Sequence, residues 1–187
     1  VHHHSLYVQR QQSHSYTMSD STEEKTLVLD HAQVNQKIKR IAFQILENNL
    51  GEKVLCLAGI DGQGYTLAQL LARELESIAP FEVLVLRVRM NKDIPSSEPV
   101  TVDAEEKEFQ KKSIVIVDDV LNSGRTLVYA LKPFLDVPVK KLQVAVLVNR
   151  AHTAFPIHPA YTGYELATTL NDHVEVTLGK KSAVHLV

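Results

Sequence analysis

The sequence predicts an α/β protein with a central, mainly parallel β-sheet flanked by helices. Short, continuous apolar runs rich in Val, Ile and Leu recur along the chain, and such runs are typical of strands that are buried on both faces. Longer segments in which apolar residues return every three or four positions lie between these runs, and that spacing indicates amphipathic helices. With 187 residues, of which 44% are hydrophobic, the chain is long enough to bury the core of one such domain.

The first part of the chain alternates between helices and strands. Asp30 is a suitable N-cap for a helix that runs to about Asn49, and Gly51 follows the expected end of this helix. Three further elements are predicted in this part of the chain: a strand over 54–58, a helix over 65–78 and a strand over 81–88. Residues 91–112 are polar and contain prolines and paired serines, so we expect a mobile loop with little regular structure there.

The most informative segment is 115–127, with the sequence V-I-V-D-D-V-L-N-S-G-R-T-L. The β-branched residues 114–117 predict a buried strand that ends in two acids, Asp118 and Asp119. A loop follows the two acids and leads into a helix that begins near Arg125 or Thr126. The residues of this loop are Asn122, Ser123, Gly124, Arg125 and Thr126. In an open α/β sheet, ligands bind just beyond the carboxyl ends of the strands, and the free N–H groups at the start of a helix suit a phosphate. Because carboxylates only accept hydrogen bonds, the two acids suit a vicinal diol or a magnesium ion, and the whole segment suits a phosphorylated ribose.

Three alternatives compete with this interpretation. An apolar strand that ends in Asp also occurs in P-loop NTPases, but the chain lacks the G-x-x-x-x-G-K-[ST] motif that such a protein needs upstream. A response-regulator receiver domain has paired acids near its start, whereas only 69 residues (187 − 118) follow Asp118 here. The third alternative is a surface Asp-Asp cap with an ordinary Ser-Gly turn. The agreement of strand, acids, loop and helix in order and spacing favours the binding site.

A glycine-rich turn is a second candidate site. It lies between the strand predicted over 54–58 and the next helix, and it consists of Gly59, Ile60, Asp61, Gly62, Gln63 and Gly64. Glycines allow backbone N–H groups to approach an anion closely, although a tight turn without a ligand is the simpler interpretation of this pattern. Farther along the chain, 142–148 is another continuous apolar strand, and 161–178 contains short strand-like pieces.

The segment 115–127 resembles the phosphoribosyl-diphosphate signature of the type I phosphoribosyltransferases. The resemblance implies that Asp118 and Asp119 hold the 2′- and 3′-hydroxyl groups of the ribose and contribute to binding of Mg²⁺, the expected cofactor. It also implies that residues 122–126 wrap the 5′-phosphate and that residues 59–64 bind the diphosphate. The implied substrates are 5-phospho-α-D-ribose 1-diphosphate and a nucleobase, the implied assembly is a homodimer, and the implied fold adds a small C-terminal hood to the sheet.

The segment 146–157 narrows the resemblance to the family of pyrimidine-operon attenuators and uracil phosphoribosyltransferases, with Tyr161 and Gly163 in support. The similarity extends over about residues 27–178. It implies uracil as the favoured base and a base side formed by Arg150, His152 and Phe155. The alternative in this family is a weakly active or inactive phosphoribosyl-diphosphate or nucleotide sensor that regulates pyrimidine genes through RNA. A net charge of −2, with acids interspersed among the basic pairs, does not favour RNA binding.

Several positions differ from the pattern of the resembled family. Phosphoribosyltransferases for 6-oxopurines usually carry Asp where this chain has Asn122, and an amide cannot act as a general base near neutral pH. Asn122 therefore argues against hypoxanthine or guanine as the substrate, although Asn also simply suits a turn. In the diphosphate loop, Asp61 and Gln63 replace basic residues, which should weaken diphosphate binding because charge-assisted hydrogen bonds are lost. Further differences are Met90-Asn91 for Tyr-Arg, Asn149 for Asp, Ala151 for Gly and Thr153 for Arg.

Other features of the composition concern location and the ends of the chain. The single cysteine, Cys56, lies in an apolar run and is expected to be a buried hydrophobic residue; one cysteine allows no disulfide within the chain, which fits a cytoplasmic protein. No apolar stretch approaches the roughly 18 residues that a membrane-spanning helix needs. Residues 1–17 contain a His-His-His run and no acid, so they resemble a purification tag or a disordered tail, and Met18 is the expected start of a single domain over 18–187.

Overall fold

A computed structural model describes residues 24–169 and 171–187 of the chain. The tag-like segment predicted over 1–17 and the expected start at Met18 lie outside these residues. The described residues form two β-sheets, one of six strands and one of three.

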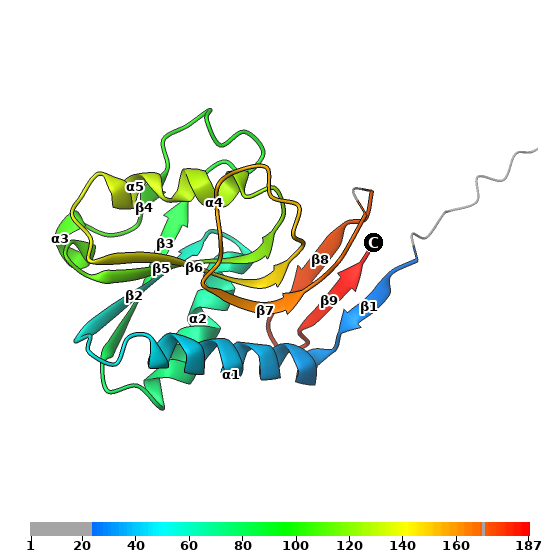
Figure 1. Ribbon diagram of the computed structural model, residues 1–187, viewed down its shortest axis with the longest axis horizontal. Helices are drawn as coiled ribbons and strands as arrows, with labels where there is room; N and C mark the ends of the chain where they lie inside the picture. The colour runs from blue at the N-terminus through cyan, green and yellow to red at the C-terminus, as the bar shows by residue number, and fades with distance from the viewer. Residues whose placement is uncertain (1–23, 170) are drawn as a thin grey trace, which may run out of the picture.

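The larger sheet lies at the centre of the protein, with its strands in the order β4-β3-β2-β5-β6-β7 (Figure 1). Its strands have the bounds β2 Val54–Ile60, β3 Glu82–Arg89, β4 Thr101–Val102, β5 Ser113–Leu121, β6 Lys141–Asn149 and β7 Tyr161–Glu165. Every neighbouring pair is parallel except β3 with β4, which is antiparallel. The prediction of a mainly parallel sheet is confirmed.

Helices cover both faces of this sheet. The helices are α1 (His31–Glu47) and α2 (Gln63–Glu76) on one face, and α3 (Glu106–Phe109), α4 (Arg125–Ala130) and α5 (Lys132–Leu135) toward the other (Figure 1). Alternate residues of β2 enter the two cores, since Leu55 and Leu57 pack with the residues of α1 and α2 while Cys56 and Ala58 pack on the opposite side. Burial on both faces explains why the strands appear in the sequence as continuous apolar runs.

The chain changes direction across the sheet at β2. From β2 it passes through α2 to β3 on one side, and it later returns to β5 on the other side of β2 before continuing to β6 and β7. The neighbouring strands β2 and β5 therefore mark a topological switch point. Open α/β sheets bind ligands at such a point, beyond the carboxyl ends of the strands. Because the glycine-rich turn ends β2 and the acidic pair belongs to β5, the topology brings the two candidate sites together.

The helix α1 begins and ends close to the predicted positions. Asp30 is its N-cap: the Asp30 side chain accepts a hydrogen bond from Gln33 N, and Gln33 Oε1 accepts one from Asp30 N. This reciprocal capping box satisfies two backbone donors that the helix itself cannot. One face of the helix is buried against the sheet through Val34, Ile38, Ile41, Ala42 and Ile45.

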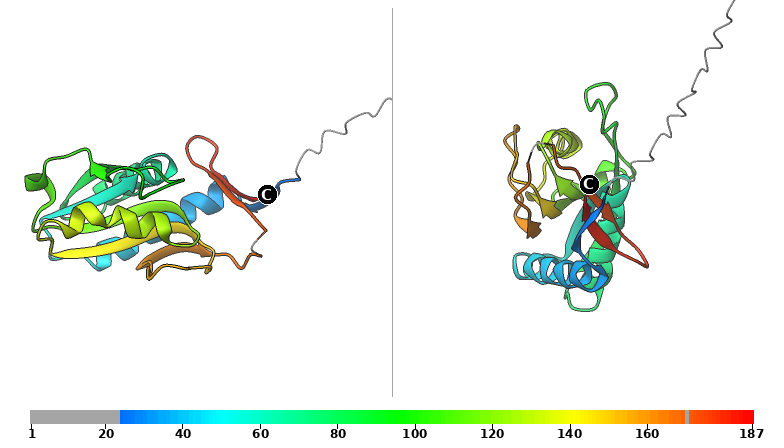
Figure 2. Two further views of the ribbon diagram at one scale, coloured as in Figure 1. Left: turned by 90° about the horizontal axis from the view of Figure 1, so that it is seen from above. Right: turned by 90° about the vertical axis from the view of Figure 1, so that its right-hand side faces the viewer.

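The smaller sheet corresponds to the predicted hood, but one of its strands comes from the N-terminal part of the chain. It has the order β1-β9-β8, with β1 Thr26–Leu29, β8 Val174–Thr177 and β9 Ala183–Leu186, and both pairs are antiparallel. Figure 2 shows this sheet set beyond one end of the larger one. The strands β1 and β9 were not predicted, whereas the strand-like pieces predicted over 161–178 correspond to β7 and β8.

Two predictions about secondary structure need correction. The strand predicted over 54–58 continues to Ile60, because its last residues still pair with β3. The prediction that 91–112 has little regular structure is wrong in part, because β4 pairs with β3 and α3 buries Phe109 against Phe134, with ring centroids 5.2 Å apart.

The remaining predictions about composition concern Cys56 and membrane spans. Cys56 is fully buried, as predicted, and burial raises the pKa of its thiol to about 11, so it is a structural rather than a reactive cysteine. Among the residues of the two described stretches, no helix is long and apolar enough to cross a membrane.

Candidate active site

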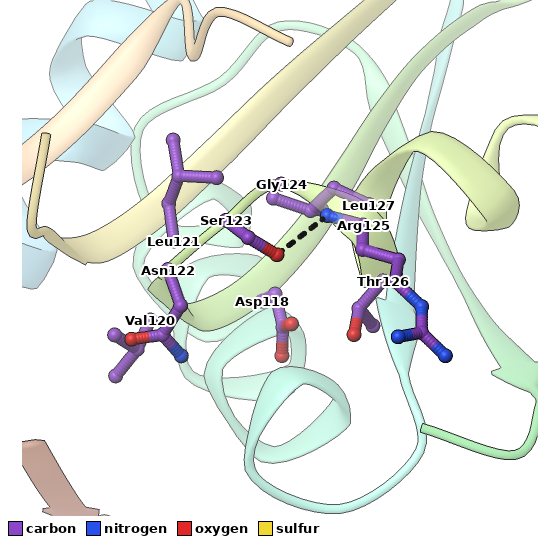
Figure 3. A pocket seen from close by; sticks show the side chains of 9 residues that line it. All are labelled: Asp118, Val120, Leu121, Asn122, Ser123, Gly124, Arg125, Thr126 and Leu127. Carbon is purple, nitrogen blue, oxygen red and sulfur yellow. Dashed lines mark hydrogen bonds between the residues drawn. The ribbon is translucent and has the colours of Figure 1, made fainter. Parts of the chain in front are cut away.

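The acidic pair lies within the last part of β5 rather than beyond it. Asp118 and Asp119 are both strand residues, because β5 stays paired with β6 as far as Leu121. The Asp118 side chain is only 4% exposed, whereas Asp119 is half-buried. Figure 3 shows Asp118 beside the loop that follows, and Asp118 and residues 120–127 line a single pocket. Asp119 is not part of this lining, so a role for both acids at a ribose stays a prediction.

Two contacts fix the Asp118 carboxylate. Its Oδ1 accepts a hydrogen bond from Asp119 N at 3.0 Å and pairs with Lys92 Nζ at 3.1 Å. Burial raises the pKa of Asp118 from its ordinary 3.8 to about 7; the charge of Asp119 also raises it, and Lys92 lowers it. A buried acid of this kind in a pocket is typical of functional sites.

Replacing Asp118 by Asn is expected to stabilise the protein more at high pH than at low pH. The raised pKa means that the folded state holds the proton more tightly than the unfolded chain, so stability is lost as the pH rises from near 3.8 to about 7. Asn carries no charge at any pH and avoids this loss. The melting temperature of the variant minus that of the wild type should therefore grow from about pH 4 to about pH 7 and then level off, as measured by calorimetry. A difference that does not change with pH would contradict the raised pKa.

The predicted phosphate loop is a tight turn supported by the segment after β6. Gly124 is the N-cap of α4 and has φ +86°, in the left-handed region. Ser123 O accepts hydrogen bonds from the N–H groups of residues 154–155 at 2.8 and 3.1 Å, and Ser123 Oγ accepts one from Arg125 N at 3.3 Å. A Cβ at Gly124 would lie 2.4 Å from Cγ2 of Ile157. The turn thus depends on glycine for its conformation and for its close packing.

The glycine-rich turn packs directly against Asp118. Its residues belong to three elements: Gly59 and Ile60 end β2, Asp61 and Gly62 form the turn, and Gln63 and Gly64 begin α2. A Cβ at Gly64 would lie 2.9 Å from Oδ1 of Asp118, so the absence of a side chain at this position lets the start of α2 approach the acid. Gln63 Oε1 accepts a hydrogen bond from Leu178 N at 3.1 Å, so this side chain connects α2 to the segment after β8.

Two arginines of β3 flank the turn, and the sequence did not identify them as site residues. Arg87 Nε and Arg89 Nη1 lie 3.5 and 3.7 Å from the Asp61 carboxylate, and Arg89 Nε also pairs with Asp103 at 2.7 Å. The Arg87 guanidinium lies 3.9 Å from the centre of the Tyr65 ring. Because β2 and β3 are parallel, their carboxyl ends meet at one edge, and the neighbouring strand places cations beside a turn that lacks its own.

The predicted base-side residues are connected to the end of the chain. Arg150 is 9% exposed and donates four hydrogen bonds, to Asn122 Oδ1 (2.9 Å), Thr168 Oγ1 (3.0 Å), Thr169 O (3.1 Å) and Asp172 O (2.6 Å). His152 Nε2 lies 2.6 Å from Thr168 O. The structure thus assigns Arg150 a supporting role at the phosphate loop, and contact of Arg150, His152 or Phe155 with a base stays a prediction.

The carboxylate oxygens of the acidic pair fit a magnesium ion whose other ligands are water and the phosphates of a bound substrate. Asp118 and Asp119 offer carboxylate oxygens, the ligands that Mg²⁺ prefers. Among the described residues, no group of three or more His, Cys, Asp or Glu side chains could hold a metal ion. Mg²⁺ commonly binds through one or two carboxylates together with water and substrate phosphates, and this site matches that mode.

The chain is similar to known proteins over most of its length. The family model described as "Phosphoribosyl transferase domain" matches residues 25–179. The bifunctional protein PyrR of Bacillus pumilus is 32% identical over 174 residues, which cover 88% of this chain and 97% of that protein. The bifunctional protein PyrR of Macrococcus caseolyticus is 34% identical over 161 residues, which cover 83% of this chain and 92% of that protein.

Solved structures share the fold at lower sequence identity. The hypoxanthine phosphoribosyltransferase of Trypanosoma cruzi superposes with a TM-score of 0.66 at 16% identity, covering 80% of this chain and 84% of that one. A hypoxanthine-guanine phosphoribosyltransferase from Bacillus anthracis gives 0.65 at 18% identity, covering 80% and 86%. At these identities the similarity establishes the arrangement of sheet and helices.

Proposed function

The chain belongs to the phosphoribosyltransferase family, and we propose that it uses 5-phospho-α-D-ribose 1-diphosphate to phosphoribosylate uracil. Family membership confirms the resemblance carried by the segment 115–127, and the relatives named PyrR confirm the narrower one. The observation that carries the proposal is that Asp118 and residues 122–126 line one pocket at the switch point between β2 and β5. The Asp118 carboxylate can accept hydrogen bonds from the hydroxyl groups of a ribose, and the N–H and O–H donors of the neighbouring turn can bind its phosphate. Together they are complementary to a phosphoribosyl group.

The proposed transfer replaces one bond at C1 of the ribose by another. N1 of uracil bonds to C1 as the bond from C1 to the diphosphate oxygen breaks, and the proton of N1 passes to solvent; the products are uridine 5′-monophosphate, diphosphate and a proton. Positive charge develops on the ribose ring in the transition state, and the Asp118 carboxylate is suitably charged to stabilise it. The hydroxyl groups of Ser123 and Thr126 and the N–H groups of their turn hold the 5′-phosphate.

The leaving diphosphate needs positive charge near the glycine-rich turn. When bound, Mg²⁺ would neutralise part of this charge. Arg87 and Arg89 lie on the next strand and presently pair with Asp61, so they can exchange that carboxylate for the diphosphate. Arg87 and Arg89 of the neighbouring strand β3 therefore offset the absence of basic residues within the turn.

The environment of Asn122 supports a pyrimidine as the acceptor. Asn122 Oδ1 accepts a hydrogen bond from Arg150 Nη1 at 2.9 Å, which orients the amide and leaves Nδ2 as a donor. A donor suits the carbonyl oxygens of uracil, whereas it cannot take the proton of a purine nitrogen.

An assay with radiolabelled bases tests the proposal. With Mg²⁺ and the phosphoribosyl donor, we expect nucleotide product from uracil and little from hypoxanthine, guanine, adenine or orotate. Asp118→Asn should remove the activity, and Asp136→Asn, which changes an exposed carboxylate on the surface, should keep it. Product from a 6-oxopurine would overturn the assignment of uracil, and failure of the donor to bind would overturn the assignment of a transferase.

A second function, regulation through RNA, is favoured by one observation. A groove beside α1 and α2 is lined by Lys39, Arg73 and Lys180, with Glu74 as its acid. Three cations in a groove suit a phosphate backbone, and such binding weakens steeply as salt increases. RNA binding that Arg73→Ala and Lys180→Ala do not weaken would argue against this groove.

A further inference from the structure

The segment that follows β3 is fixed beside the phosphate loop. Asn91 Oδ1 accepts hydrogen bonds from the N–H groups of residues 93–94, both at 3.0 Å, which makes a local turn. Arg125 Nη2, at the start of α4, donates to Asp93 O at 3.2 Å. These contacts hold the residue between them, Lys92, at the acidic pair.

Lys92 provides the counter-charge of Asp118. Its Nζ lies 3.1 Å from Asp118 Oδ1, and the Lys92 side chain is 38% exposed while that of Asp118 is 4% exposed. Within the described stretches, no other cationic side chain comes within ion-pair distance of Asp118. A nearly buried carboxylate needs such a partner, because an isolated charge is costly to remove from water.

An ammonium group and a divalent ion compete for this position. Both act as compact positive charges, and Mg²⁺ would need carboxylate oxygens of the same acidic pair. An ammonium group has three N–H donors, of which one serves Asp118. The other two are available to hydroxyl oxygens of a bound ribose.

We propose that Lys92 is the resident cation of the acidic pair: it takes the place of a divalent ion at Asp118, so that a phosphoribosyl group binds here without metal. The inference rests on the proposed function for the identity of the ligand. It restricts the divalent ion to the departure of the diphosphate. Lys92 would then decide which step needs a metal: binding of the phosphoribosyl group would not need one, whereas transfer would.

Calorimetric titration with ribose 5-phosphate tests the inference, since this probe carries the ribose and the phosphate but no diphosphate. The full chain should bind it equally well, within about threefold, in EDTA and in Mg²⁺. Lys92→Met keeps the length of the side chain and removes the charge; it should lose at least about tenfold in affinity in EDTA and regain it in Mg²⁺. Lys181→Met, an exposed lysine before β9, is the matched control and should behave as the wild type.

Titration with Mn²⁺ alone tests the competition without any ligand. Lys92→Met should bind Mn²⁺ at least about tenfold more tightly than the wild type, because the acidic pair then loses the positive charge of Lys92, which faces Asp118. A melting curve of each variant shows that it is folded.

The outcomes separate this inference from the proposed function. Loss of ribose 5-phosphate affinity by the wild type in EDTA, or unchanged affinity of Lys92→Met in EDTA, would overturn the role of Lys92. If ribose 5-phosphate binds in neither buffer, the proposed function fails, and the Mn²⁺ comparison then decides on Lys92 by itself. Equal Mn²⁺ affinities of wild type and variant would overturn it.

Discussion

Replacing Arg150 by alanine is expected to lower the free energy of unfolding by about 3 kcal/mol. The guanidinium donates four hydrogen bonds, to a side chain of the phosphate loop and to Thr168, Thr169 and Asp172 near the end of the chain. Its removal leaves several partly buried acceptors without a donor, and each such group costs free energy. Urea denaturation followed by circular dichroism gives the measurement.

Two further variants make the Arg150 result specific. Arg150→Lys keeps the charge but not the planar fork, so it should recover only a minor part of the loss. Arg73→Ala removes an exposed arginine on α2 and should change stability by less than about 0.5 kcal/mol. If Arg150→Ala and Arg73→Ala are equally stable, the hydrogen bonds of Arg150 do not hold the end of the chain to the phosphate loop.

The part of the site that sequence predicts well is the part that is local in sequence. Strand, acid, turn and helix start follow one another in the segment 115–127, so their order and spacing carry most of the geometry. The structure places Asp118 and residues 122–126 around one pocket, as that order suggests. The apolar runs likewise predict the central strands, because burial on both faces is imposed on every residue of the strand.

Contacts between distant parts of the chain could not be predicted in this way. Lys92 reaches Asp118 across 26 positions and Arg150 reaches Asn122 across 28, and no local sequence pattern indicates either contact. The sequence suggested Arg150 as a contact of the base, whereas the structure shows its donors engaged by neighbouring protein groups. Only the fold reveals which polar side chains share a buried acceptor.

The small sheet shows the same limit for secondary structure. The strand β1 lies near the start of the described chain and pairs with β9 near its end, with Leu27 opposite His185. Strands this short and only partly buried carry a weak periodicity, and their pairing is stabilised by partners far along the chain.

The glycine-rich turn shows what a sequence observation about a single loop leaves out. Asp61 does stand where a basic residue is expected, and a loss of diphosphate affinity follows if the turn is considered alone. The parallel pairing of β2 with β3 adds Arg87 and Arg89 at the same edge of the sheet. The charge around this turn therefore depends on the adjacent strand as well as on the loop itself.

Replacing Gly124 by alanine is expected to lower the affinity for ribose 5-phosphate on the order of 100-fold. At φ +86° an L-residue costs about 1–2 kcal/mol, and the added Cβ would lie 2.4 Å from Cγ2 of Ile157, which forces the turn to move. The backbone of the turn that lines the pocket then loses its position. Titration calorimetry gives the affinity, and Gly51→Ala, where a Cβ meets open space, is the matched control.

Combining Gly124→Ala with Ile157→Ala separates the two causes. The second substitution removes the overlap with Ile157 but leaves the left-handed backbone unchanged, so it should restore part of the affinity, up to the cost of the backbone alone. Full recovery would show that packing against the segment after β6, rather than backbone conformation, holds the turn in place. If Gly124→Ala alone binds as tightly as the wild type, the backbone of the turn does not hold the phosphate. The polar side chains of the loop, those of Asn122, Ser123, Arg125 and Thr126, would then have to provide the binding.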